Sequence, residues 1–143
     1  MEPSSELRAV RRLGIAFILF AIAFNLPYSW LAVNFDYPAI LRSQPGDILA
    51  AFTAGGAPLI LAWAAFALAA LFFGPIAVGM AKVTMRGGHS ASAVAGLGVA
   101  AGVTQAIGLS RWVYAVPGLA TGWAASAGDA RGDSVGIHAL GVL

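Results

Sequence analysis

Three long stretches of the chain contain no Asp, Glu, Lys or Arg: Leu13–Phe35, Ile48–Ala81 and Gly87–Ser110. Each is long enough to cross a bilayer, because a spanning helix needs about 20 mostly apolar residues. Only 10% of the 143 residues are charged and 59% are hydrophobic, so a soluble fold would lack the polar surface to cover its apolar residues. The spacing of charge therefore predicts an all-α integral membrane protein with three transmembrane helices.

The expected spans cover residues 13–33, 57–81 and 90–110, in a single transmembrane helical domain of residues 1–120. Pro27 and Gly74-Pro75 predict kinks in the first two spans, because proline removes a backbone donor and crowds the preceding turn. Pro117-Gly118 is expected to end the last helix. Residues 121–143 are rich in Gly, Ala and Ser, and this composition predicts a disordered C-terminal tail.

A short additional helix is expected between the first two spans. Pro45 and Asp47 are typical of a helix start, and Gly55-Gly56 is typical of a helix end. The residues between them form an apolar stripe of Ile48, Leu49 and Phe52. This pattern favours a helix that lies in the membrane interface.

A secretory signal peptide is the main alternative for the first span. Arg8, Arg11 and Arg12 would form its positive region, and Leu13–Ala23 its apolar core. However, the apolar stretch continues to Val33, about twice the usual core length, and it lacks a good small-x-small cleavage site. A retained helix is therefore favoured.

The basic residues predict how the spans are oriented. With the amino terminus inside, five of the eight basic residues lie on the cytoplasmic side: Arg8, Arg11, Arg12, Lys82 and Arg86. This distribution follows the positive-inside rule and places the carboxyl terminus outside. The same topology gathers the Trp and Tyr residues toward the outer boundary, where amphipathic rings are favourable.

Small residues recur every four positions in the third span. Gly98, Gly102 and Ala106 are the centre of this stripe, which would let another helix backbone approach closely. The partner helix is either in the same chain, which is the favoured interpretation, or in a second copy or a partner membrane protein.

Polar groups near the outer end of the third span are the other candidate site. Gln105 lies within the span and Arg111 at its end. Arg111 beside Trp112 is typical of an interfacial anchor. The alternative is a structural or ligand pair of Arg111 with Asp36 or Asp47, which the predicted topology places on the same side.

Most specific chemistries have no support in the sequence. The chain has no cysteine and no metal-ligand set, and no nucleophile or acid pair lies within a span, so no catalytic residue, metal or cofactor is expected. No basic cluster is large enough for nucleic acid. The expected partner is the lipid bilayer, with a homo-oligomer or partner helices through the third span.

Two segments resemble motifs of a known family. Asn34–Arg42 (NFDYPAILR) and Gly108–Pro117 (GLSRWVYAVP) are similar to segments of bacterial multi-pass membrane proteins in the family named domain of unknown function 4386. The resemblance covers about Arg11–Ala120 and implies a helical protein of the bacterial inner membrane, with no implied reaction. Family members are typically longer, so the hypothesis follows that the chain is truncated and ends in a non-native tail.

These observations favour a non-enzymatic component of the inner membrane. The first alternative is a subunit or fragment of a small-molecule transporter, although the spans contain no Asp, Glu, Lys or Arg for an ion pathway. The second alternative is a membrane-embedded enzyme, although no reactive group is recognised within a span.

Overall fold

The computed structural model describes residues 3–85 and 88–126, and this part of the chain is helical apart from short connections. Its elements are α1 (Pro3–Asn34), the 3-10 helix η1 (Ala39–Arg42), α2 (Pro45–Leu71), α3 (Phe73–Thr84) and α4 (His89–Tyr114). Three helical segments are long and apolar enough to cross a membrane: Glu6–Asn34, Pro45–Thr84 and His89–Ser126. The predicted all-α fold with three candidate spans is confirmed.

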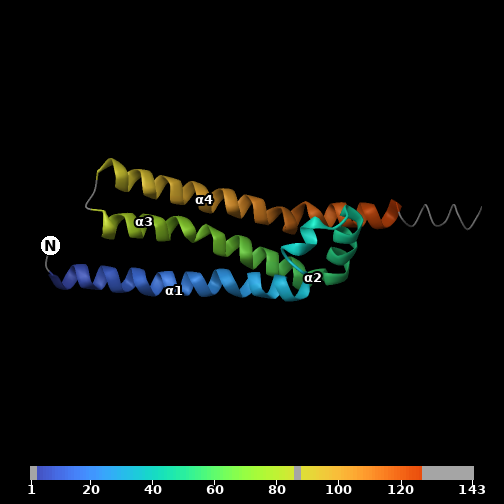
Figure 1. Ribbon diagram of the computed structural model, residues 1–143, viewed down its shortest axis with the longest axis horizontal. Helices are drawn as coiled ribbons and strands as arrows, with labels where there is room; N and C mark the ends of the chain where they lie inside the picture. The colour runs from blue at the N-terminus through green and yellow to red at the C-terminus, as the bar shows by residue number, and fades with distance from the viewer. Residues whose placement is uncertain (1–2, 86–87, 127–143) are drawn as a thin grey trace, which may run out of the picture.

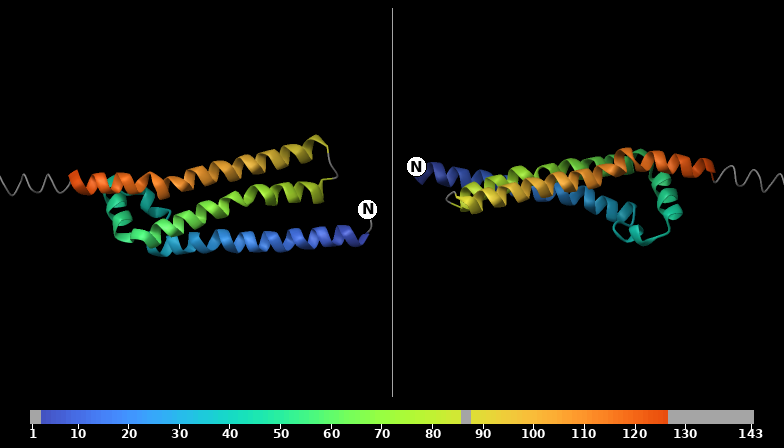
Figure 2. Two further views of the ribbon diagram at one scale, coloured as in Figure 1. Left: turned by 180° about the vertical axis from the view of Figure 1, so that it is seen from behind. Right: turned by 90° about the horizontal axis from the view of Figure 1, so that it is seen from above.

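The three candidate spans lie side by side, with α2 and α3 forming the middle rod (Figure 1). α1 and α4 flank this rod on opposite sides, which the view from behind also shows (Figure 2). In the most apolar part of the middle span 44% of residues are buried, against 11% in the first and 17% in the third. The helices thus form an open layer in which only the middle rod is covered on both sides.

The short helix between the first two spans is present as the first part of α2. Pro45 stands at its start and Asp47 in its first turn. Gly56 ends it with a φ of 54° and a ψ of −148°, a conformation that is essentially restricted to glycine. This part of α2 turns away from the direction of the spans (Figure 1), and its apolar stripe packs against the protein core through the buried Phe52.

The middle rod is broken where the sequence predicts its kink. α2 ends at Leu71 and α3 begins at Phe73. Pro75 has no N–H to donate to the carbonyl oxygen of Leu71, four residues earlier, and its ring crowds that carbonyl. The kink predicted at Pro27 does not interrupt α1, which continues to Asn34. The amide of Asn25 donates to the Ala21 carbonyl oxygen on the same helix at 2.8 Å.

The expectation that Pro117-Gly118 ends the last helix is wrong. α4 ends at Tyr114, and after a turn at Ala115 the chain is helical again over residues 116–126. Pro117 lies in the first turn of this new segment, where a backbone N–H has no helical partner and proline is tolerated. Ala120 is buried in the core, and this packing stabilises the helical segment. Residues 121–126 of the expected tail are therefore helical, and residues 127–143 lie outside the described part.

Candidate functional site

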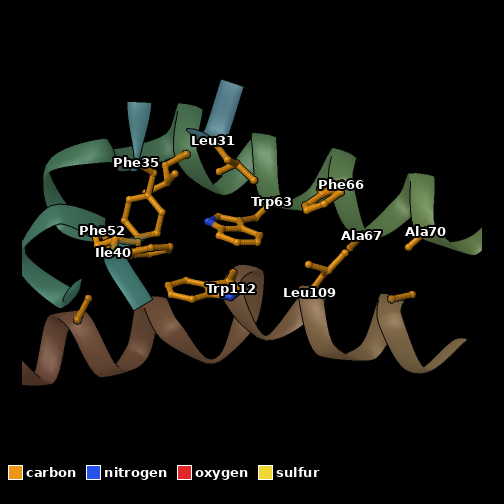
Figure 3. Packing of buried hydrophobic residues seen from close by; sticks show 13 residues of the cluster. Leu31, Phe35, Ile40, Phe52, Trp63, Phe66, Ala67, Ala70, Leu109 and Trp112 are labelled. Carbon is orange, nitrogen blue, oxygen red and sulfur yellow. The ribbon is translucent and has the colours of Figure 1, made fainter. Parts of the chain in front are cut away.

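Aromatic side chains from three segments meet at the end of the layer opposite the amino terminus. We call Phe35, Tyr37, Phe52, Trp63, Phe66 and Trp112 the aromatic cluster. Phe35 and Tyr37 follow α1, the next three residues belong to α2, and Trp112 belongs to α4. Figure 3 shows the rings of Trp63 and Trp112 between α2 and α4, with Phe35 and Phe52 beside them.

The two tryptophans form the centre of the aromatic cluster. Their rings are stacked, with centroids 4.7 Å apart and planes at 7°. Trp63 is fully buried and Trp112 is 6% exposed. The ring of Phe35 meets Trp112 edge-on at 5.6 Å, and that of Tyr37 meets Trp63 edge-on at 5.0 Å. Aromatic pairs contribute about 0.5–1.5 kcal/mol each beyond the burial of their area, so this cluster ties α2 to α4 and to the end of α1.

The Nε1–H group of Trp63 is buried without a hydrogen-bond partner among the described residues. An unsatisfied buried donor costs about 1–3 kcal/mol. The residues buried in the described part of the chain include no polar or charged side chain. The aromatic cluster therefore tolerates this cost through its packing.

The segment after α1 folds so that its rings face the cluster. The amide of Phe35 donates to the Leu31 carbonyl oxygen at 2.9 Å, which completes α1. Asp36 then takes a positive φ of 51°, which Asp and Asn tolerate better than most residues. The amide of Ile40 donates to the Asp36 carbonyl oxygen at 2.8 Å, and Ile40 is buried. The chain reverses within these few residues and returns to the core.

The aromatic cluster brings together the two motifs that the sequence analysis singled out. Phe35 and Tyr37 belong to Asn34–Arg42, and Trp112 belongs to Gly108–Pro117. These motifs are far apart in the chain but make direct ring contacts, and both contact Trp63. The sequence predicts Tyr37 and Trp112 at the outer boundary of the membrane and Trp63 in the outer half of its span, but it did not predict that these rings pack together. The helical periodicity of α2 could have predicted that Trp63 is buried. The buried residues of α2 are spaced three or four positions apart on one face and include Leu59, Trp63, Phe66, Ala67 and Ala70.

The small-residue stripe of α4 lies against α2 and α3 of the same chain. Gly98, Gly102 and Ala106 are all buried. A Cβ added at Gly98 would overlap the Cβ of Ala77. One added at Gly102 would lie 3.1 Å from the Ala70 carbonyl oxygen and 3.2 Å from the Gly74 nitrogen. Glycine at these positions allows the backbones to approach, as expected for small-residue packing between membrane helices.

Arg111, Asp36 and Gln105 all have exposed side chains. The hydrogen bonds of the described residues include none between them, and the pairing of Arg111 with a carboxylate stays a prediction. The guanidinium carbon of Arg111 lies 5.9 Å from the centroid of the Trp112 ring. Trp112 itself is buried, so of the Arg111-Trp112 pair only Arg111 is exposed.

No group of three or more His, Cys, Asp or Glu residues that could hold a metal ion occurs in residues 3–85 and 88–126. Chemistry-bearing side chains are thus dispersed in this region, and its most organised feature is the aromatic cluster. Three long apolar helices, an apolar core and polar residues at the helix ends define a multi-pass helical membrane protein.

Within this class, the chain belongs to the family described as Domain of unknown function (DUF4386), which matches residues 13–140. The match continues past Ala120, where the resemblance was expected to end, and includes most of the segment interpreted as a non-native tail. A search of curated proteins found no match, and neither did a search of solved structures.

Proposed function

We propose that the chain is a non-enzymatic structural component of a bacterial inner membrane, with its amino terminus in the cytoplasm and its carboxyl terminus outside. The observation that carries this proposal is the chemical type of the side chains buried between the spans. Buried positions of the described residues are filled by aliphatic, aromatic and small residues. Side chains of this kind supply packing between helices and offer no group for proton transfer or nucleophilic attack.

The placement of charge supports the proposed orientation. Arg8, Arg11 and Arg12 lie in the first turns of α1, and Lys82 lies in the last turn of α3. These two helix ends are at the same end of the layer (Figure 1). Arg42 and Arg111 are at the opposite end, where the aromatic cluster also lies. More basic residues at the end that carries the amino terminus follow the positive-inside rule.

The open layer favours a second candidate, a subunit of a larger membrane assembly such as a small-molecule transporter. α1 exposes large apolar side chains that include Ile18, Leu19 and Leu26, and α4 exposes Leu97 and Ile107. Lipid or further helices must cover these faces in a membrane. The stripe of Gly98 and Gly102 is already covered by α2 and α3, so partner helices would use the outer faces of α1 and α4.

Single-cysteine labelling in intact cells tests the proposed orientation, because the chain contains no cysteine of its own. Glu6 and Ser43 are exposed at opposite ends of the layer. A membrane-impermeant maleimide should label Ser43→Cys in intact cells and Glu6→Cys only after lysis. The reverse pattern would overturn the orientation. A stoichiometric metal or organic cofactor in the purified protein, detected by mass spectrometry, would overturn the non-enzymatic role.

Counting subunits in lipid nanodiscs by single-molecule photobleaching tests whether the assembly is made of copies of this chain. One bleaching step per nanodisc would count against a homo-oligomer. Two or more steps would favour one, with α1 and α4 as the faces to examine next.

A further inference from the structure

α3 and α4 are closest in the middle of their length and separate toward the turn that joins them. Ala77 and Gly98 lie in close contact, because a methyl group added at Gly98 would overlap the Cβ of Ala77. Lys82 lies five residues further along α3, which is about 7.5 Å of helix. The two ribbons diverge in this direction (Figure 1).

A groove of about 320 Å³ lies between the diverging helices. Val78, Ala81, Lys82 and Met85 line it from α3, and α4 contributes three small residues, Ala91, Ser92 and Ala95. The lining is mostly apolar, and the three residues from α4 have small side chains. The groove is thus suited to part of an extended apolar chain.

The mouth of the groove is positively charged. Lys82 is the one ionisable residue among those that line it. α4 begins next to it, and its N-cap residue Gly88 makes no side-chain capping hydrogen bond, so the first amides of α4 add a partial positive charge. Arg8, Arg11 and Arg12 lie at the same end of the layer, where Glu6 is the acidic residue of the described α1 side chains.

We propose that the groove between α3 and α4 binds an anionic phospholipid, with the phosphate at Lys82 and the upper part of an acyl chain against Val78 and Ala95. The charge of the mouth complements a lipid phosphate, and the apolar walls complement the chain beneath it. Basic pockets between membrane helices on the cytoplasmic side are typical of such lipid sites. The assignment to the inner leaflet rests on the proposed orientation, whereas binding itself does not.

Native mass spectrometry of the full chain in detergent, with equal amounts of phosphatidylglycerol and phosphatidylcholine of the same acyl chains, tests the proposal. The unchanged protein should retain phosphatidylglycerol in preference to phosphatidylcholine. Lys82→Gln removes the charge but keeps a side chain of similar length, and should weaken phosphatidylglycerol retention on the order of fivefold, since each Lys near a membrane surface contributes about 1 kcal/mol.

Arg42→Gln is the matched control, because it makes the same change of charge at an exposed position at the opposite end of the layer. It should leave retention unchanged. Equal losses in the Lys82 and Arg42 variants, or equal retention of the two lipids by the unchanged protein, would overturn the proposal.

A second pair of variants tests the groove without changing charge. Ala95→Leu fills the groove and should reduce the retention of phosphatidylglycerol. Ala100 is at an exposed position of α4 outside the groove lining, so Ala100→Leu should leave this retention unchanged. Circular dichroism establishes that each variant is folded. Detergent has no leaflets, so the lipid experiment is independent of orientation. A failure of lipid retention would not contradict the proposed orientation. A reversed cysteine-labelling pattern would not contradict lipid binding.

Discussion

The contact between Gly98 and Ala77 sets the distance between α3 and α4, and a single methyl group should disturb it. In Gly98→Ala the new Cβ would overlap the Cβ of Ala77. Ala77 has no flexible side chain that could move aside, so the helices must separate toward the normal carbon contact distance of about 3.5–4.0 Å. That movement would also loosen the approach of Gly102 to Ala70, where a Cβ would lie 3.1 Å from the carbonyl oxygen.

Gly96→Ala provides the matched control for this change. A Cβ at Gly96 has no atom within 4 Å, apart from its own helix and chain neighbours. Both substitutions gain the same helix propensity, up to about 1 kcal/mol, so the difference between them isolates the overlap. Overpacking of a close contact costs about 1–3 kcal/mol. We therefore expect Gly98→Ala to be less stable than Gly96→Ala by about 1–3 kcal/mol.

Reversible unfolding in mixed micelles, followed by tryptophan fluorescence, measures this difference. A compensating change sharpens the test, because Ala77→Gly removes the group that Gly98→Ala would meet. The double variant should recover most of the loss, giving a coupling energy of about 0.5–3 kcal/mol. Equal stability of the Gly98 and Gly96 variants, or no recovery in the double variant, would refute the role of this contact.

Three further predictions concern the opposite end of the layer. Gly56→Ala should destabilise the protein by about 1–3 kcal/mol, since Gly56 has a φ of 54°, and unchanged micelle unfolding would contradict this. Trp112→Ala should cost about 3–5 kcal/mol and reduce the near-ultraviolet circular dichroism of its stack with Trp63; an unchanged spectrum would argue against the stack. Losses in Arg111→Ala and Asp36→Ala should add within about 0.5 kcal/mol, because the two side chains are not in contact, and a larger coupling energy would contradict this structure.

The architecture along the chain was predictable, because it depends on local chemistry. Charge-free stretches set the number of candidate spans. The lack of an N–H at Pro75 explains the break at Phe72, and the pairing of Pro45 with Gly55-Gly56 marks a short helix. Local chemistry does not decide the structure where tertiary contacts compete with it. Pro117 was expected to stop a helix, but the burial of Ala120 supports a further helical segment.

The candidate site was not predictable to the same extent. Hydrophobicity separates inside from outside in a soluble protein, but lipid is as apolar as a protein core, so a tryptophan in a membrane helix can face either. Trp112 is adjacent to Arg111 in the sequence, which suggested that both face the membrane boundary. In the structure Trp112 is buried and Arg111 is exposed, since successive residues of a helix point in different directions.

The sequence alone thus determined that this is a helical membrane protein, where its helices break, and which residues are small enough for close contact. Those properties follow from bilayer thickness, backbone donors and side-chain size, which act locally. Tertiary structure decided which faces meet. It placed Gly98 against Ala77 and stacked Trp63 on Trp112, because pairing of helix faces depends on the fit of side chains that lie far apart in the chain.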